Sequence, residues 1–113
     1  CCQSGPYIRL RVTPVFNRDL IRIEDPFIWK EQDLYPMIAK DMRGDVCGQK
    51  HGGMHAISPD GIHWEVIPSD LAYTRGLHWD DGKTELMGLL ERPFLLFENG
   101  KPAHAFFGTS NGT

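Results

Sequence analysis

Two acidic residues, Asp25 and Glu91, stand in a pattern that the chain carries twice. In residues 23–28 and again in residues 90–95, acidic side chains come just before a proline and an apolar run. Carboxylates at these places could donate or accept protons during a reaction. A pattern that recurs in this way is typical of a repeat architecture, so we expect the acids of the two copies to converge on a shared centre.

The repeated pattern predicts a β-hairpin in each copy. After the apolar run the chain meets a short polar turn, at residues 30–33 and 98–101, and then a second apolar stretch, at residues 35–39 and 103–107. Pro26 and Pro93 each open a strand, where a missing N–H costs least. These hairpins are the elements that must position the two acids.

The rest of the chain also predicts β-structure. Apolar and polar residues alternate over residues 7–15, which indicates a half-buried strand interrupted by Pro14. Residues 46–58 and 62–67 flank a type I turn, Ser58-Pro59-Asp60-Gly61, and predict another hairpin. Residues 80–83 predict a further turn, and residues 69–75 could hold no more than one helical turn.

Four strands between residues 23 and 67, followed by a restart at Leu90, predict one whole antiparallel blade and the inner half of the next. We therefore predict an all-β chain of antiparallel β-propeller-like blades. Residues 1–14 form an N-terminal segment, and residues 15–113 form a partial propeller. Its first blade covers residues 23–67, and its incomplete second blade covers residues 90–113.

Composition excludes several classes of partner. The chain has 113 residues, 41% hydrophobic and 24% charged, which suits one small globular domain. Its formal net charge of −3 and scattered basic residues provide no field for nucleic acid. No apolar run reaches the length of a membrane span, so we expect neither nucleic acid nor membrane as partner.

The terminus and the cysteines carry little information. The three cysteines are an odd number, and Cys1 and Cys2 are adjacent, so we predict no disulfide framework and no role for that pair. The first residues lack the pattern of a signal peptide. A start without methionine indicates processing, an artificial start or a fragment of a longer reading frame. Localisation cannot be read from these residues.

Three motifs together resemble a known group of enzymes. Residues 58–64, Ser-Pro-Asp-Gly-Ile-His-Trp, resemble the S-x-D-G-x-x-W outer turn of five-bladed propeller glycoside hydrolases, the group that includes families 32, 43 and 117. Glu24-Asp25-Pro26 resembles their second-blade acidic motif, and Leu90-Glu91-Arg92-Pro93 resembles their third-blade motif. The resemblance covers about residues 15–113.

The resemblance implies roles for both acids in cleaving a glycosidic bond. Glu91 would be the general acid that protonates the departing oxygen. Asp25 would raise the pKa of Glu91 through its like charge and orient the sugar. Two structural alternatives stay open: Asp25 could cap a turn at the start of its strand, and Glu91 could form a salt bridge with Arg92 or Lys101.

The chain departs from the family pattern at the third carboxylate. These enzymes take their base or nucleophile from a first blade, and the one acid available before residue 24 is Asp19, which is too close in sequence to serve. The chain also resembles only about one and a half to two of five blades. We therefore expect a fragment, a ring assembled from several copies, or a site that has lost its third member.

Cys47, His51 and His55 offer a competing interpretation, because residues four apart on a strand share a face. Four residues along a strand span about 13 Å, too far for one ion to bridge, so we assign no metal site. The resemblance favours hydrogen bonds from His51 or His55 to sugar hydroxyls. Ordinary packing within a strand remains the alternative.

Aromatic rings could stack on sugar faces. We expect Trp64, which ends the outer turn, and Trp29, which lies inside a strand, to pack in the core. Trp79, beside the turn at residues 80–83, is the candidate for substrate contact, with packing of its loop as the alternative. With His51, His55 and Arg92 it completes the candidate substrate-binding residues.

The sequence thus favours a glycoside hydrolase-like chain that is incomplete or inactive by itself, with Asp25 and Glu91 as its catalytic pair. The alternative is a non-catalytic carbohydrate-binding or structural β module. A carbohydrate substrate is the expected partner, together with a homo-oligomer or the missing blades, and we assign no cofactor. If the chain follows the resembling family, it is periplasmic or secreted.

Overall fold

The computed structural model describes residues 8–10 and 13–111, and strands are the only regular elements in that part of the chain. The all-β prediction is confirmed. The predictions for Cys1, Cys2, Tyr7 and Val12 fall outside the described residues. Residues 8–10 and 13–111 contain no helix long and apolar enough to cross a membrane.

Four strands form the main antiparallel sheet, in the order β1-β2-β3-β4. They are β1 (Ile23–Ile28), β2 (Tyr35–Asp41), β3 (Gly53–Ser58) and β4 (Glu65–Tyr73). Each strand pairs with the next along the chain, as short connections favour. The predicted four-stranded unit between residues 23 and 67 is therefore present, with its last strand longer than expected.

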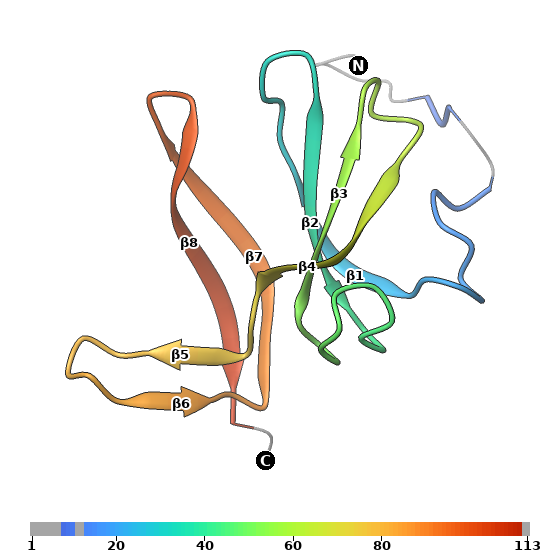
Figure 1. Cartoon of the computed structure of the whole chain (residues 1–113). Helices are drawn as coiled ribbons and strands as arrows, with labels where there is room; N and C mark the ends of the chain where they lie inside the picture. Colours follow the sequence, from blue (N-terminus) through green and yellow to red (C-terminus); the bar gives the residue numbers. More distant parts are fainter. Residues whose placement is uncertain (1–7, 11–12, 112–113) are drawn as a thin grey trace.

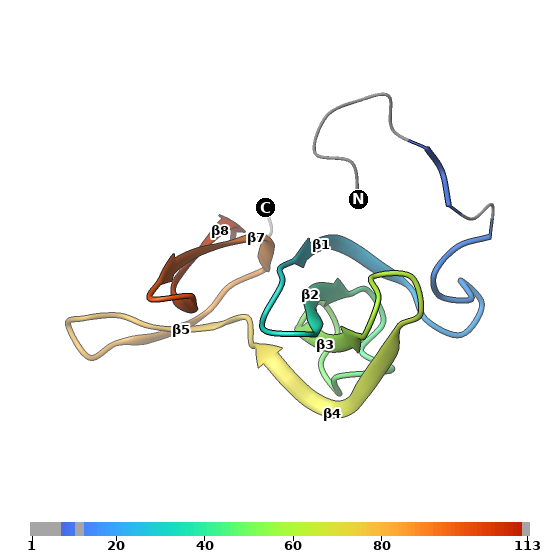
Figure 2. The ribbon, with the colours of Figure 1, turned by 90° about the horizontal axis from the view of Figure 1, so that it is seen from above.

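Two further hairpins follow. One joins β5 (Gly76–His78) to β6 (Thr84–Leu86), and the other joins β7 (Leu89–Glu98) to β8 (Lys101–Ser110). The β7–β8 hairpin lies beside the four-stranded sheet with β7 next to β1, while β5 and β6 project away from that sheet (Figures 1 and 2). In the described residues these sheets do not close into a ring.

Aromatic rings fill the contact between the sheets. Phe27 of β1 packs edge-on against Phe94 of β7, with ring centroids 5.6 Å apart, and stacks on Phe97 at 6.5 Å. Trp29 also meets Phe97, at 6.1 Å. On the opposite face of the main sheet, the core gathers Met37, Ala39, Val46, Cys47, Met54 and Ala56, with Trp64 against it. The packing role predicted for Trp64 is confirmed. The prediction that Trp29 lies inside a strand and in the core is wrong: Trp29 follows the end of β1, is half-buried, and packs against Phe27 and Phe97 between the sheets.

Two local predictions are wrong. Residues 46–52 form a loop instead of the start of a strand, because the backbone N–H groups of Val46 and Cys47 bond to the side chain of Asp41. Residues 8–10 and 13–15 form no strand. Residues 69–73 continue β4, where Ser69 takes a φ of 61° at an irregular register, and no helical turn forms.

Asp41 organises the loop between β2 and β3. It is 1% exposed, and its two carboxylate oxygens accept hydrogen bonds from the backbone N–H groups of four residues: Arg43, Gly44, Val46 and Cys47. Burial alone would raise the pKa of Asp41, but these N–H groups favour the ionised form and lower its pKa below the usual range. The loop therefore depends on an ionised side chain.

We predict that Asp41→Asn destabilises the fold by about 2–4 kcal/mol, because charge-assisted bonds are lost and buried N–H groups are left poorly paired. Urea unfolding measures the effect. Asp45→Asn is the matched control, since Asp45 is largely exposed and pairs with Arg43 at the surface. A loss as small as the control's would show that the loop does not need this carboxylate.

The loss of stability caused by Asp41→Asn should depend on pH. A carboxyl group whose pKa is lowered on folding adds stability above its unfolded pKa, near 3.9, and this stability is lost as the pH falls through the folded value. The difference between the original chain and Asp41→Asn should therefore be full at pH 7 and shrink progressively below about pH 4. A difference that is constant with pH would contradict this assignment.

Candidate functional site

The two predicted acids lie at bulges that start the two long hairpins. The register between β1 and β2 shifts between Glu24 and Phe27, and the register between β7 and β8 shifts between Glu91 and Phe94. Asp25 has a φ of 52° and its equivalent Arg92 has a φ of 54°. The repeated Glu-x-Pro-Phe phrase thus encodes the same bulge twice, with Glu24 as the equivalent of Glu91.

These bulges carry backbone strain. A residue other than glycine held at positive φ costs about 1–3 kcal/mol, and such residues cluster at functional sites. His51, at a φ of 63°, adds a third case in the neighbouring loop. Strain at three places around one group of charges is a reason to examine that group.

The charges meet at Lys40, near the end of β2. Its side chain is 5% exposed, and its Nζ lies 2.6 Å from Glu91, 3.2 Å from Glu24 and 3.4 Å from Asp25. Glu24 and Asp25 belong to β1, whereas Glu91 belongs to β7, so one ammonium joins both sheets. We call Lys40, Glu24, Asp25 and Glu91 the Lys40 cluster.

Mutual pairing sets the charges of the cluster. Burial would lower the pKa of Lys40, but its hydrogen bonds to Glu91 and Glu24 outweigh burial and raise that pKa above the usual value. The Lys40 hydrogen bond is the main cause that lowers the pKa of Glu91. The expectation that Asp25 raises this pKa is wrong for this arrangement, because an ammonium contacts both carboxylates.

The salt bridge predicted as an alternative role for Glu91 exists, but with a different partner. Lys40 makes the contact, in place of Arg92 or Lys101. The carboxylate of Asp25 also lies against Lys40 instead of capping a turn. Asp19 is exposed, and its backbone carbonyl accepts a bond from Arg43.

His51 and Arg92 lie around the cluster. Arg92 is exposed on the bulge next to Glu91. The N–H of His51 donates to the carbonyl of Asp41 at 2.7 Å, which holds the residue beside the end of β2. Burial is the main cause that lowers the pKa of His51, and the positive charges of Lys50 and Lys40 lower it further. At pH 7 this imidazole is therefore neutral and able both to donate and to accept a hydrogen bond.

His55 and Trp79 lie elsewhere. His55, on β3, pairs with Asp70 through Nδ1 at 2.7 Å and lines a groove of about 330 Å³ between the two sheets. Trp79 follows β5 in the projecting hairpin, where its Nε1 donates to Glu85. Cys47 donates to the carbonyl of Gln49. Within the described residues, no three His, Cys, Asp or Glu side chains are grouped to hold a metal.

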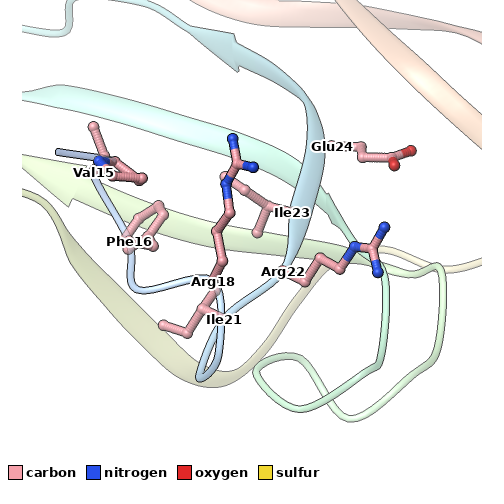
Figure 3. Close-up of a pocket in the computed structure, with 8 residues that line it drawn as sticks. Val15, Phe16, Arg18, Ile21, Arg22, Ile23 and Glu24 are labelled. Atoms are coloured by element: carbon pink, nitrogen blue, oxygen red, sulfur yellow. The ribbon is translucent and has the colours of Figure 1, made fainter. Parts of the chain in front are cut away.

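One cavity lies largely apart from this chemistry. It measures about 540 Å³ and is lined by residues 14–24 alone, so Glu24 is its one member from the Lys40 cluster. Figure 3 shows apolar side chains such as Phe16 and Ile21 beside the two arginines, Arg18 and Arg22. A cavity lined by one segment is better explained by loose packing of that segment than by a reaction centre.

Sequence reasoning missed three residues: Lys40 and Glu24 of the cluster, and Tyr73 at the end of β4, whose hydroxyl is buried. A lysine that closes the otherwise apolar run 35–39 was a usable signal, because the hairpin register places it opposite Glu24. Tyr73 had no comparable signal.

Comparisons with protein-family models, with curated proteins and with solved structures find no match to this chain.

We predict that Lys40→Met raises the pKa of Glu91, because it removes the main cause that lowers it and leaves three carboxylates close together. Carbon-13 NMR of the glutamate carboxyl groups measures this pKa directly. Lys30→Met is the control, since Lys30 is exposed and lies over the ring of Tyr35. An unchanged Glu91 titration would show that the 2.6 Å contact does not form in solution.

Proposed function

We propose that this chain is part of a propeller-type glycoside hydrolase-like protein that binds carbohydrate at the Lys40 cluster. The observation that carries the proposal is the convergence of three carboxylates, from two equivalent strained bulges, on one buried ammonium. Cleavage of a glycosidic bond uses paired carboxylates around a transition state of positive charge. The resemblance of both bulge motifs to those of propeller glycosidases supports the same centre.

Packing between the repeats supports further blades. The face of the first hairpin that packs toward β7 includes Phe27, Trp29 and Ile38. The register of the two hairpins makes Phe94, Leu96 and Phe106 their equivalents. Although Phe94 meets Phe27 edge-on, these equivalents are 57%, 46% and 57% exposed. An apolar face that is covered in one repeat and open in the next is what a continuing blade series produces.

The proposed acid role of Glu91 requires a change at Lys40. A general acid must be protonated when substrate is bound, whereas the Lys40 contact favours the ionised form. In the catalytic interpretation, a bound sugar lengthens the contact between Nζ and the Glu91 carboxylate, and the pKa of Glu91 then rises. A further carboxylate, equivalent to the first-blade base or nucleophile of the resembling enzymes, comes from another blade or another copy.

The second candidate is carbohydrate binding without catalysis, and the same contact favours it. Ionised carboxylates and an ammonium offer acceptors and donors to sugar hydroxyls without any proton transfer. The two candidates share one site and differ in whether Glu91 becomes protonated in the complex.

We predict that the chain binds cationic iminosugars, which imitate the positive charge of the transition state, and that Asp25→Asn and Glu91→Gln each weaken this binding about tenfold or more. Isothermal titration calorimetry with a panel of monosaccharide iminosugars measures the affinity. Glu98→Gln is the matched control, since Glu98 is exposed at the far end of β7. Equal, small losses in all three variants would show that the cluster is scaffold.

Hydrolysis separates the two candidates. We expect little or no turnover from the 113-residue chain alone, because Asp19 is the sole acid among residues 1–22 that could replace the first-blade base or nucleophile. In an assembly that is active, Glu91→Gln should abolish cleavage of poor leaving groups and spare activated aryl glycosides, which need little protonation. Robust hydrolysis by the chain alone that Asp19→Asn abolishes would overturn this assignment.

A further inference from the structure

A row of paired residues crosses the main sheet at the Lys40 cluster. Glu24 pairs with Lys40, Lys40 pairs with Gly53, and Gly53 pairs with Tyr73. Directly opposed residues in antiparallel strands project to the same face of a sheet. Lys40 and Tyr73 therefore share the face toward β7 and are separated by a residue without a side chain.

The absent side chain at Gly53 lets the ring of Tyr73 lie across β3. A Cβ built on Gly53 would come within 2.2 Å of that ring, so the ring rests directly on the glycine backbone. Its other neighbour is Phe107 of β8, with ring centroids 4.8 Å apart. Tyr73 is thus held between the two sheets and beside the Lys40 cluster.

The hydroxyl of Tyr73 is buried and has no hydrogen-bond partner within the described part of the chain. A buried donor without a partner destabilises a fold, so such a group calls for an explanation. Burial raises the pKa of Tyr73, and the negative charges of Asp25 and Glu91 raise it further. The hydroxyl therefore keeps its proton and stays a donor close to both carboxylates.

Space beside the ring allows the hydroxyl to reach a ligand. Tyr73 borders the 330 Å³ groove that His55 also lines, so one side of the ring is not closely packed. A small tilt of the Tyr73 ring into this groove would move the hydroxyl without breaking a hydrogen bond, because the hydroxyl makes none with the described residues.

We propose that Tyr73 is a ligand-binding residue of the Lys40 cluster, and that its hydroxyl donates a hydrogen bond to a hydroxyl oxygen of the bound sugar. This role rests on the proposed carbohydrate-binding function. It explains why a tyrosine occupies a place where phenylalanine would pack equally well. It also gives the site a neutral donor, which its carboxylates cannot supply.

The test is Tyr73→Phe in the full chain, with iminosugar binding and urea unfolding measured together. Because the hydroxyl has no hydrogen-bond partner among the described residues, the urea midpoint should stay the same or rise, while the affinity for the iminosugar that binds best should fall about fivefold. Tyr35→Phe, at the opposite end of β2, is the control and should change neither quantity.

Each other outcome has a distinct meaning. A lower urea midpoint for Tyr73→Phe would show that the hydroxyl supports the fold, and would overturn the proposal. Unchanged affinity in Tyr73→Phe, with weakened affinity in Asp25→Asn, would remove Tyr73 from the site and keep the proposed function. Failure of the unsubstituted chain to bind any iminosugar of the panel would overturn the proposed function and this role together.

Discussion

A buried ammonium is the constraint around which this chain is arranged. A charge removed from water is very costly unless opposite charges and hydrogen bonds surround it. Lys40 is 4% exposed, and it draws carboxylates from its own sheet and from β7. The cluster therefore ties the two sheets together at one end, while Phe27, Trp29 and Phe97 hold them together farther along the strands. An apolar contact alone would not fix the position of β7 along β1, because apolar packing is non-directional. The ion pairs of the Lys40 cluster fix which ends of the two strands lie together.

The strained bulges make sense beside this constraint. A regular strand would alternate its side chains between two faces, and Glu24 and Asp25 could not both turn to one ammonium. Positive φ at Asp25 breaks the alternation, and the resulting contacts with Lys40 offset the strain. The second hairpin repeats the device with Arg92 in place of Asp25. One bulge thus supplies two carboxylates, and the other supplies one carboxylate and an exposed guanidinium.

Lys40 and Asp41, at the end of β2, project to opposite faces of the sheet and make different contacts. Lys40 faces β7, and Asp41 turns to the loop that follows and binds its backbone N–H groups. That loop in turn brings His51 to the cluster. Both residues are ionised in the folded state, so the site and the loop beside it depend on two adjacent buried charges of opposite sign. In the proposed function, this arrangement presents ready acceptors to a sugar and makes any acid role of Glu91 conditional on movement at Lys40.

The sequence by itself determined the strands of the β1–β2 and β7–β8 hairpins and several of the turns. Alternating apolar residues and the turn at residues 58–61 are local signals, and the hairpins that they predict are present. The prediction that Pro26 and Pro93 open strands is wrong, because both lie inside β1 and β7, at the two bulges. The repeated phrase also singled out Asp25 and Glu91 as candidates. Tertiary structure alone decided that both carboxylates meet Lys40, that Glu24 joins them, and that Trp79 projects away with its hairpin. It also decided that residues 46–52 form a loop around Asp41. The physical reason is that charge pairing and burial depend on which strands face one another across space, whereas strand and turn preferences are written into neighbouring residues.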